Sequence, residues 1–278
     1  MVAPLAQQIN TQGYTVLRGF LEPGVVESVR QAASGLVDAL AAERVGSGAV
    51  PRDFAEEPFE TRLIRLFEGD MDQAPKQFRE NLHLPGVFPL FFHPRLLDVV
   101  QGILGPEIRL YPNYTVRPKL PEWKGTEVLW HQDAAYTESW TPGAPVTSMH
   151  MVNVWTPLVP ATVENGCMAF IPGTHTLGTV RHEDRQYYLE IAREELEPRL
   201  PQAVPIECNP GDVVLFHNLL FHCGLPNHSR TIRWSADWRY QDAREPTHRP
   251  KNGHLARSAS RPNEVVKNPS DWAHRTFV

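Results

Sequence analysis

Two short stretches of the chain carry side chains that could together bind a metal ion. His131 and Asp133 are separated by one residue, and residues at this spacing lie on the same face of a β-strand. An imidazole and a carboxylate would then stand side by side, and a third ligand must come from elsewhere. The apolar run 211–222 contains His217 and His222, five residues apart. On a continuous strand this odd spacing places the two histidines on opposite faces, so we expect one of them to face the metal.

Two histidines and one carboxylate form the facial triad of non-haem Fe(II) oxygenases. Such a triad leaves adjacent coordination positions open for a chelating co-substrate and O₂, whereas a structural zinc site is closed by four ligands. Three alternatives remain at this point. The histidines could be hydrogen-bonded core residues, the ion could be zinc that activates water for hydrolysis, or the chain could be a non-enzymatic binding module of jelly-roll type.

A second pair of residues predicts a site for a dicarboxylic co-substrate. Arg233 and Ser235 follow His222 by eleven and thirteen residues and share one face of a β-rich run. An arginine can grip a carboxylate with two hydrogen bonds, and a buried arginine needs an anionic partner. The alternative is a salt bridge between Arg233 and a protein carboxylate. Arg239 has the same parity as Arg233, so it could meet an anionic substrate or bridge to a surface carboxylate.

The elements that must position these residues divide the chain into a helical first part and a β-rich second part. Residues 13–18 have the composition of a strand, and amphipathic or apolar segments predict helices. These helices are expected at residues 25–44, 58–68 and 94–103, and one helical insertion is expected at 185–197. Short β-rich runs broken by Pro and Gly follow residue 107 and predict a sandwich or barrel. They include residues 108–111, 128–133, 148–156, 167–171, 212–216 and 231–240.

We therefore predict a mainly β fold with flanking helices, a double-stranded β-helix of the jelly-roll or cupin-like kind. Residues 1–278 are interpreted as one domain with a helical part (1–106), a β-helix core (107–242) and a C-terminal extension (243–278) of little regular structure.

Composition narrows the class of protein. The 278 residues are 41% apolar and 21% charged, which is typical of a globular protein, and the formal net charge of -5 argues against a nucleic-acid partner. The three cysteines show neither zinc-ligand spacing nor a disulfide framework. No signal peptide or membrane-spanning segment is visible, so we expect a cytoplasmic protein without a membrane partner. The oligomeric state is left open.

Several longer motifs resemble the phytanoyl-CoA dioxygenase family of Fe(II)/2-oxoglutarate-dependent oxygenases. They appear in the family's order between residues 130 and 240, and together they are specific although each alone is not. The motifs are WHQD (130–133), VNVWTPL (152–158), ENGCMAFIPGTH (164–175), PGDVVLFHNLLFH (210–222) and NHSRTIRWS (227–235).

The resemblance implies a double-stranded β-helix and names the ligands. It implies that three residues bind iron: His131, Asp133 and His222. The family's spacing favours His222 over His217 as the second histidine, and Arg233 over Arg230 as the co-substrate arginine. The implied contacts of 2-oxoglutarate are Arg233, Ser235, Gln132, Trp155 and Asn113.

The resemblance also implies a reaction. The enzyme would be a dioxygenase that uses Fe(II), 2-oxoglutarate and O₂ to oxidise, most readily by hydroxylation, a C–H bond of a small molecule, with release of succinate and CO₂. Desaturation, ring closure and epimerisation are alternative outcomes. Asp133 argues against halogenation, because related halogenases have Gly or Ala at that position. Tyr136 and Arg239 are the expected substrate contacts, but the fold supports many chemistries and does not identify the substrate.

Overall fold

Two antiparallel sheets form the centre of the computed structural model, which describes residues 2–278, with side chains from residue 5 onward. The larger sheet has the order β1-β10-β5-β12-β2-β13, and β3 also pairs with β12. Its strands are β1 (Tyr14–Leu17), β2 (Ile108–Leu110), β3 (Thr115–Lys119), β5 (Met151–Pro157), β10 (Val213–His217), β12 (Arg233–Asp242) and β13 (His254–Arg257).

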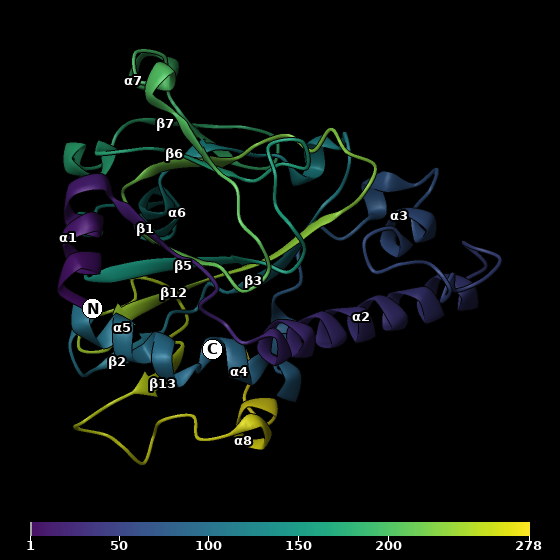
Figure 1. Ribbon diagram of the computed structural model, residues 1–278, viewed down its shortest axis with the longest axis horizontal. Coiled ribbons are helices and arrows are strands. Elements are labelled where there is room, and N and C mark those ends of the chain that lie inside the picture. Colours follow the sequence, from purple (N-terminus) through teal and green to yellow (C-terminus); the bar gives the residue numbers. More distant parts are fainter. Residues whose placement is uncertain (1) are drawn as a thin grey trace.

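The smaller sheet has the order β4-β11-β6-β9, and a separate hairpin joins β7 to β8. Its strands are β4 (Val128–His131), β6 (Met168–Ile171), β9 (Val204–Ile206) and β11 (Phe221–Gly224). The hairpin consists of β7 (His182–Asp184) and β8 (Leu189–Ile191). In Figure 1, β6 and β7 lie above β5 and β12, so the two sheets form separate layers.

Helices cover the outer face of the larger sheet. Figure 1 shows α4 and α5 below β5 and β12, with the long α2 extending to the right. The α-helices are α1 (Val2–Gln12), α2 (Pro23–Gly46), α3 (Arg62–Leu66), α4 (Phe88–Phe91), α5 (Pro94–Leu104), α6 (Asp133–Trp140), α7 (Arg193–Leu196) and α8 (Pro269–Ala273). Short 3-10 turns occur at Met71–Gln73, Glu80–Leu82, Pro85–Val87, Lys124–Thr126, Thr174–Leu177 and Leu200–Gln202.

Strand β12 explains how the sheet separates a core from a cavity. All ten of its residues are buried. Because side chains alternate along a strand, one set packs with the helices in the main hydrophobic core: Trp234, Ala236, Trp238 and Tyr240. The other set consists of Arg233, Ser235, Asp237 and Arg239, and it points to the opposite side, between the sheets.

The predicted fold class is confirmed, but several local features differ from the predictions. The region 185–197 is not one helix: it contains the turn of the β7–β8 hairpin, strand β8 and the single turn α7. Helix α1 was not predicted. The C-terminal segment is more regular than expected, because β13 joins the larger sheet and α8 buries Trp272 completely. Strand β4 ends at His131 rather than continuing to residue 133.

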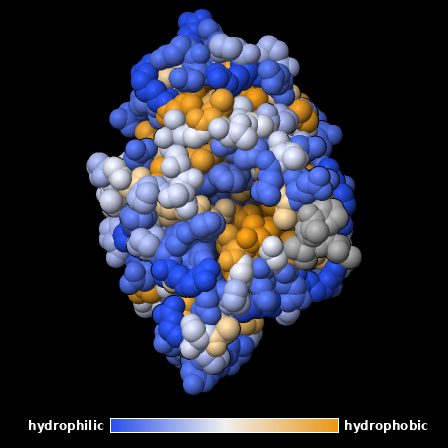
Figure 2. Space-filling view, turned by 90° about the vertical axis from the view of Figure 1, so that its left-hand side faces the viewer, coloured by the Kyte–Doolittle hydropathy of each residue, from blue (hydrophilic) through white to orange (hydrophobic). Residues whose placement is uncertain are grey.

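On the face shown in Figure 2, hydrophilic residues predominate, and hydrophobic ones gather near the top and in a central hollow. Among residues 2–278, no single helix is long and apolar enough to cross a membrane, although the bent pair Pro85–Phe91 and Pro94–Leu104 passes by length and composition.

Candidate active site

Three buried side chains meet where β4, β11 and α6 converge. His131 and His222 are directly opposite each other in the β4–β11 pairing, and Asp133 is the first residue of α6. One donor atom from each of the three lies within 4.8 Å of the others. His131 and Asp133 lie side by side as expected, but not on one strand, because the chain passes from β4 into α6 between them.

The two histidines are oriented to offer Nε2 to an ion. Nδ1 of His131 donates to the carbonyl of Leu129 at 2.7 Å, and Nδ1 of His222 donates to the carbonyl of Leu220 at 2.8 Å. Because a carbonyl oxygen only accepts, each Nδ1 carries the hydrogen and each Nε2 of a neutral ring keeps a lone pair. Burial and the neighbouring His131 lower the pKa of His222 to about 3, so this ring is neutral near neutral pH. The donor set therefore fits a divalent metal ion.

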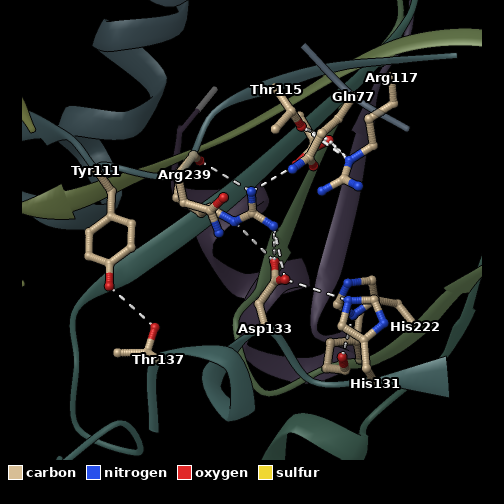
Figure 3. A network of polar contacts seen from close by, with 12 residues as sticks. Gln77, Tyr111, Thr115, Arg117, His131, Asp133, Thr137, His222 and Arg239 are labelled. Carbon is tan, nitrogen blue, oxygen red and sulfur yellow. Dashed lines mark hydrogen bonds and ion pairs between the residues drawn. The ribbon is translucent and has the colours of Figure 1, made fainter. Parts of the chain in front are cut away.

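Arg239 holds the carboxylate of the triad. Its Nε and Nη2 donate to Asp133, and its Nη1 donates to Asp237 at 2.7 Å and to the carbonyl of Asn113 at 3.2 Å (Figure 3). Burial alone would raise the pKa of Asp133, but Arg239 and the contact with His131 hold it well below its usual range. All five N–H groups of this guanidinium have acceptors. The expectation that Arg239 contacts substrate is thus not supported by its geometry, and its partners are buried rather than surface carboxylates.

Arg233 is a buried cation without a carboxylate partner among the residues that the structure describes. Its Nε donates to the carbonyl of Gly166 at 3.1 Å, and its Nη1 donates to the hydroxyl of Ser235. The guanidinium carbon lies 5.6 Å from the ring centroid of Trp155. Burial lowers the pKa of Arg233 to about 10. A buried guanidinium in these surroundings needs an anion from outside the protein.

A glycine allows this arrangement. Gly166 has φ +87°, and a Cβ there would come within 2.4 Å of the Leu225 carbonyl oxygen. Only glycine tolerates both conditions, so Gly166 permits the turn that brings its own carbonyl to Arg233.

The remaining predicted residues divide into two groups. Asn113 lines the same cavity, and its Oδ1 is buried without a hydrogen-bond partner. Tyr136 also lines the cavity, with its ring edge-on to His131 at a centroid distance of 5.4 Å and its hydroxyl accepting from the Leu189 amide at 3.1 Å. His217 lies outside the cavity, where its Nδ1 accepts from the Leu219 amide.

Gln132 points away from the cavity, contrary to the expectation of a co-substrate contact. Its Nε2 donates to the carbonyls of Gly178 and Leu219 at 2.8 and 2.7 Å, and its Oε1 accepts from the Val180 amide at 3.0 Å. The side chain is fully buried and is already occupied by three backbone groups. Gln132 therefore ties the neighbouring loops to the end of β4.

The triad and Arg233 share one cavity of about 250 Å³ between the sheets. It also contains charged residues that the sequence interpretation did not single out: Arg79, Arg117, Asp237 and Arg249. Alternation along 115–119 would have found Arg117, since it pairs with Ser235 across β3 and β12. Arg79 and Arg249 lie outside helices and strands, where no periodic pattern marks the direction of a side chain.

Comparison with known proteins agrees with this geometry. The profile of the family described as "Phytanoyl-CoA dioxygenase (PhyH)" matches residues 9–235. A "1-deoxypentalenic acid 11-beta-hydroxylase" from Streptomyces exfoliatus is 27% identical over 246 residues, which are 83% of this chain and 78% of that protein. A "Probable phytanoyl-CoA dioxygenase" from Caenorhabditis elegans is 25% identical over 180 residues, 62% of this chain and 55% of that protein.

The alignments cover 55%, 38% and 56% of three of the curated relatives, so the chain spans about half of their length or less. Among solved structures, EctD from S. alaskensis, determined with 2-oxoglutarate and 5-hydroxyectoine, superposes with a TM-score of 0.62 at 23% identity. The superposition covers 99% of this chain and 84% of EctD. At this identity the likeness shows the fold.

Proposed function

The chain belongs to the phytanoyl-CoA dioxygenase family, and from this premise we propose that it is an Fe(II)- and 2-oxoglutarate-dependent dioxygenase that hydroxylates a C–H bond of a small molecule. The observation that carries the proposal is the triad of His131, Asp133 and His222 in one cavity with the unpaired Arg233. When bound, iron and 2-oxoglutarate would activate O₂, releasing succinate and CO₂ and supplying the oxidant for the C–H bond.

The roles of the protein side chains follow from their contacts. Nε2 of His131, Nε2 of His222 and the carboxylate of Asp133 would hold the ion on one side and leave the cavity side open. Arg239 would keep the Asp133 carboxylate ionised and in place, since it donates to both of its oxygens. A ligand held by a charged partner in this way is preorganised for metal binding.

The co-substrate would lie between the ion and Arg233. Arg233 and the Ser235 hydroxyl would bind its far carboxylate, which offsets the desolvation of a guanidinium that has no protein carboxylate. Trp155 would form the wall beside it, and the amide of Asn113, whose Oδ1 has no partner, would contact the co-substrate or substrate. Tyr136 would border the substrate, because its ring stands against His131.

Hydroxylation is the outcome that we propose among those open to this chemistry. The Streptomyces relative that matches most of this chain is described as a hydroxylase. The carboxylate of Asp133 agrees with this choice, because halogenases of this kind have Gly or Ala at the corresponding position.

The test is anaerobic addition of Fe(II) and 2-oxoglutarate, followed by exposure to O₂ with a metabolite library. We expect a weak visible charge-transfer band, and then succinate together with a product heavier by one oxygen atom. His222→Ala should abolish both signals and His217→Ala should retain them, because only His222 lines the cavity. Absence of the band in the wild-type protein, or turnover without O₂ and 2-oxoglutarate, would refute the proposal in favour of a binding module or a hydrolase, respectively.

A further inference from the structure

The cavity contains more positive charge than the proposed chemistry uses. It is lined by five arginines and two aspartates: Arg79, Arg117, Arg233, Arg239 and Arg249 against Asp133 and Asp237. Doubly charged iron and doubly charged 2-oxoglutarate cancel each other, so their binding would leave this excess unchanged. Uncompensated charge in a partly buried cavity is costly unless a ligand neutralises it.

The two aspartates and the co-substrate account for only part of this charge. Arg239 uses all its N–H groups on Asp133, Asp237 and one carbonyl. Arg233 is assigned to the far carboxylate of 2-oxoglutarate. Three cations are left: Arg79, Arg117 and Arg249.

Arg117 presents free donors to the cavity. Its Nε donates to Asp237 at 2.7 Å and to the Thr115 hydroxyl at 3.1 Å. Its Nη1 and Nη2 have no hydrogen bond to any residue of the described chain. In Figure 3 the side chain extends from its strand toward the side where Asp133 and the histidines lie. Asp237 therefore fixes the near side of this guanidinium and leaves two nitrogens for a ligand.

The positive charge of Arg79 has even less compensation from the protein than that of Arg117. It takes part in no ion pair within the described part of the chain, its Nε is buried without a partner, and its Nη2 reaches only the Gln77 oxygen at 3.5 Å. Burial and the nearby Arg117 lower the pKa of Arg79 to about 10. Arg79 is therefore a largely buried cation near Arg117 that has no carboxylate partner of its own in the described chain.

Aromatic rings stand at the same cavity and suit the body of a ligand. Trp140 and Tyr187 line it and are 60% and 39% exposed, so they mark its mouth. The guanidinium carbon of Arg249 lies 6.0 Å from the ring centroid of Trp140, and its Nε donates to the hydroxyl of Tyr111. The mouth therefore combines apolar faces with a further cation.

We propose that Arg117 and Arg79 bind an acidic group of the substrate, a carboxylate or a phosphate, whose apolar body lies against Trp140 and Tyr187. This inference rests on the proposed function and narrows its substrate to an organic acid or phosphate. The planar guanidinium groups give such an anion paired, directional hydrogen bonds. They also anchor one end of the substrate so that a C–H bond elsewhere in it reaches the metal side of the cavity.

The test compares acids with their neutral amides on wild-type protein loaded anaerobically with Fe(II) and 2-oxoglutarate. Suitable probes are arylalkanoates of increasing length, such as 3-phenylpropanoate and 4-phenylbutanoate, with the matching amides and with phenyl phosphate. Binding is read from the change in the visible band and from the thermal shift. We expect acids to bind about tenfold more tightly than their amides, as for hydrogen bonds to a charged group. A stronger response to phenyl phosphate than to the arylalkanoates would identify phosphate as the acidic group.

Two variants locate the effect. Arg79→Gln breaks no ion pair within the described chain, and Arg117→Gln removes the free Nη donors. Each variant should reduce the preference for acids over amides about tenfold. The dissociation constant of 2-oxoglutarate should stay unchanged in both. Arg117→Lys should retain part of the preference, because it keeps the charge. Arg193→Gln is the matched control, since the Arg193 side chain is 80% exposed on α7 and, within the described residues, forms an ion pair only with Glu197.

Equal binding of acids and amides across the whole series would overturn the inference. So would a loss of 2-oxoglutarate affinity in Arg79→Gln or Arg117→Gln as large as the loss of acid binding, because those residues would then belong to the co-substrate site. A failure of the proposed function looks different, since the wild-type protein would form no visible band with Fe(II) and 2-oxoglutarate.

Discussion

The two faces of β12 are equally buried and do different things. Exposed fractions do not exceed 8% on either face. The outward residues Trp234, Trp238 and Tyr240 pack in the main hydrophobic core, and the only hydrogen bonds of their side chains within the described chain go to backbone carbonyls. The inward residues Arg233 and Arg239 face the cavity, where their contacts are charges and hydrogen bonds. Burial by itself therefore does not separate stability from function on this strand; the kind of partner does.

The largest effect is expected from Arg239→Met, which removes the shared cation of two buried carboxylates. Asp133 would lose its partner, and Asp237 would keep only Arg117. The free energy of unfolding should fall by about 3–5 kcal/mol. Fe(II) should narrow the difference in the free energy of unfolding between the variant and wild type. The ion supplies a cation to the variant's Asp133, which has lost Arg239, whereas the wild-type Asp133 already has that partner. Denaturation with and without Fe(II) under anaerobic conditions measures this, and a difference that Fe(II) leaves unchanged would contradict Asp133 as a ligand.

Trp238→Ala tests the opposite face of the same strand. Trp238 is fully buried in the main core, so its truncation should cost about 3–5 kcal/mol in the free energy of unfolding. Only the variant's stability should change: Fe(II) should not narrow the difference, and the folded protein should bind 2-oxoglutarate as wild type does. Weaker 2-oxoglutarate binding by fully folded Trp238→Ala would contradict the assignment of the two faces of β12, one to the core and one to the binding site.

Arg233→Met should separate binding from stability. Loss of the guanidinium should weaken 2-oxoglutarate binding by about 2–5 kcal/mol, which titration of the visible band measures. Without 2-oxoglutarate, the free energy of unfolding should stay the same or rise, because a buried cation without a protein carboxylate is removed. Destabilisation as large as that of Trp238→Ala would show that Arg233 is a structural residue.

The smallest effect is expected from Gln132→Leu. The change leaves the backbone groups of Gly178, Val180 and Leu219 without their side-chain partner, so the free energy of unfolding should fall by about 1–3 kcal/mol. Because the side chain points away from the cavity, the dissociation constant of 2-oxoglutarate should not change. A selective loss of 2-oxoglutarate affinity would restore Gln132 as a co-substrate contact.

Local spacing accounts for much of the site. The parity of Arg233, Ser235 and Arg239 on one run placed them on one face of β12, because the pleat of a strand is the same wherever the strand lies. For the histidines, parity indicated that one of the two faces the metal, and the family motif selected His222. The fold class followed from many short β-rich runs after a helical start.

Other features depended on contacts between distant segments. Strand alternation predicted that Asp133 lies beside His131, as it does in the structure. However, Asp133 belongs to helix α6 and not to a continued strand. The region 185–197 has helical composition but pairs β8 with β7, and Arg79 enters the cavity from a loop.

The sequence by itself determined which residue types were available and which of them share a face within one strand, because backbone geometry is local. Only the tertiary structure decided that Arg239 uses all its N–H groups on protein acceptors, while Arg117 keeps both Nη groups, and Arg79 its Nε, without a hydrogen-bond partner in the described chain. The pairing of a charge depends on which groups from remote segments the packing brings within hydrogen-bond distance, and no pattern along the chain carries that information.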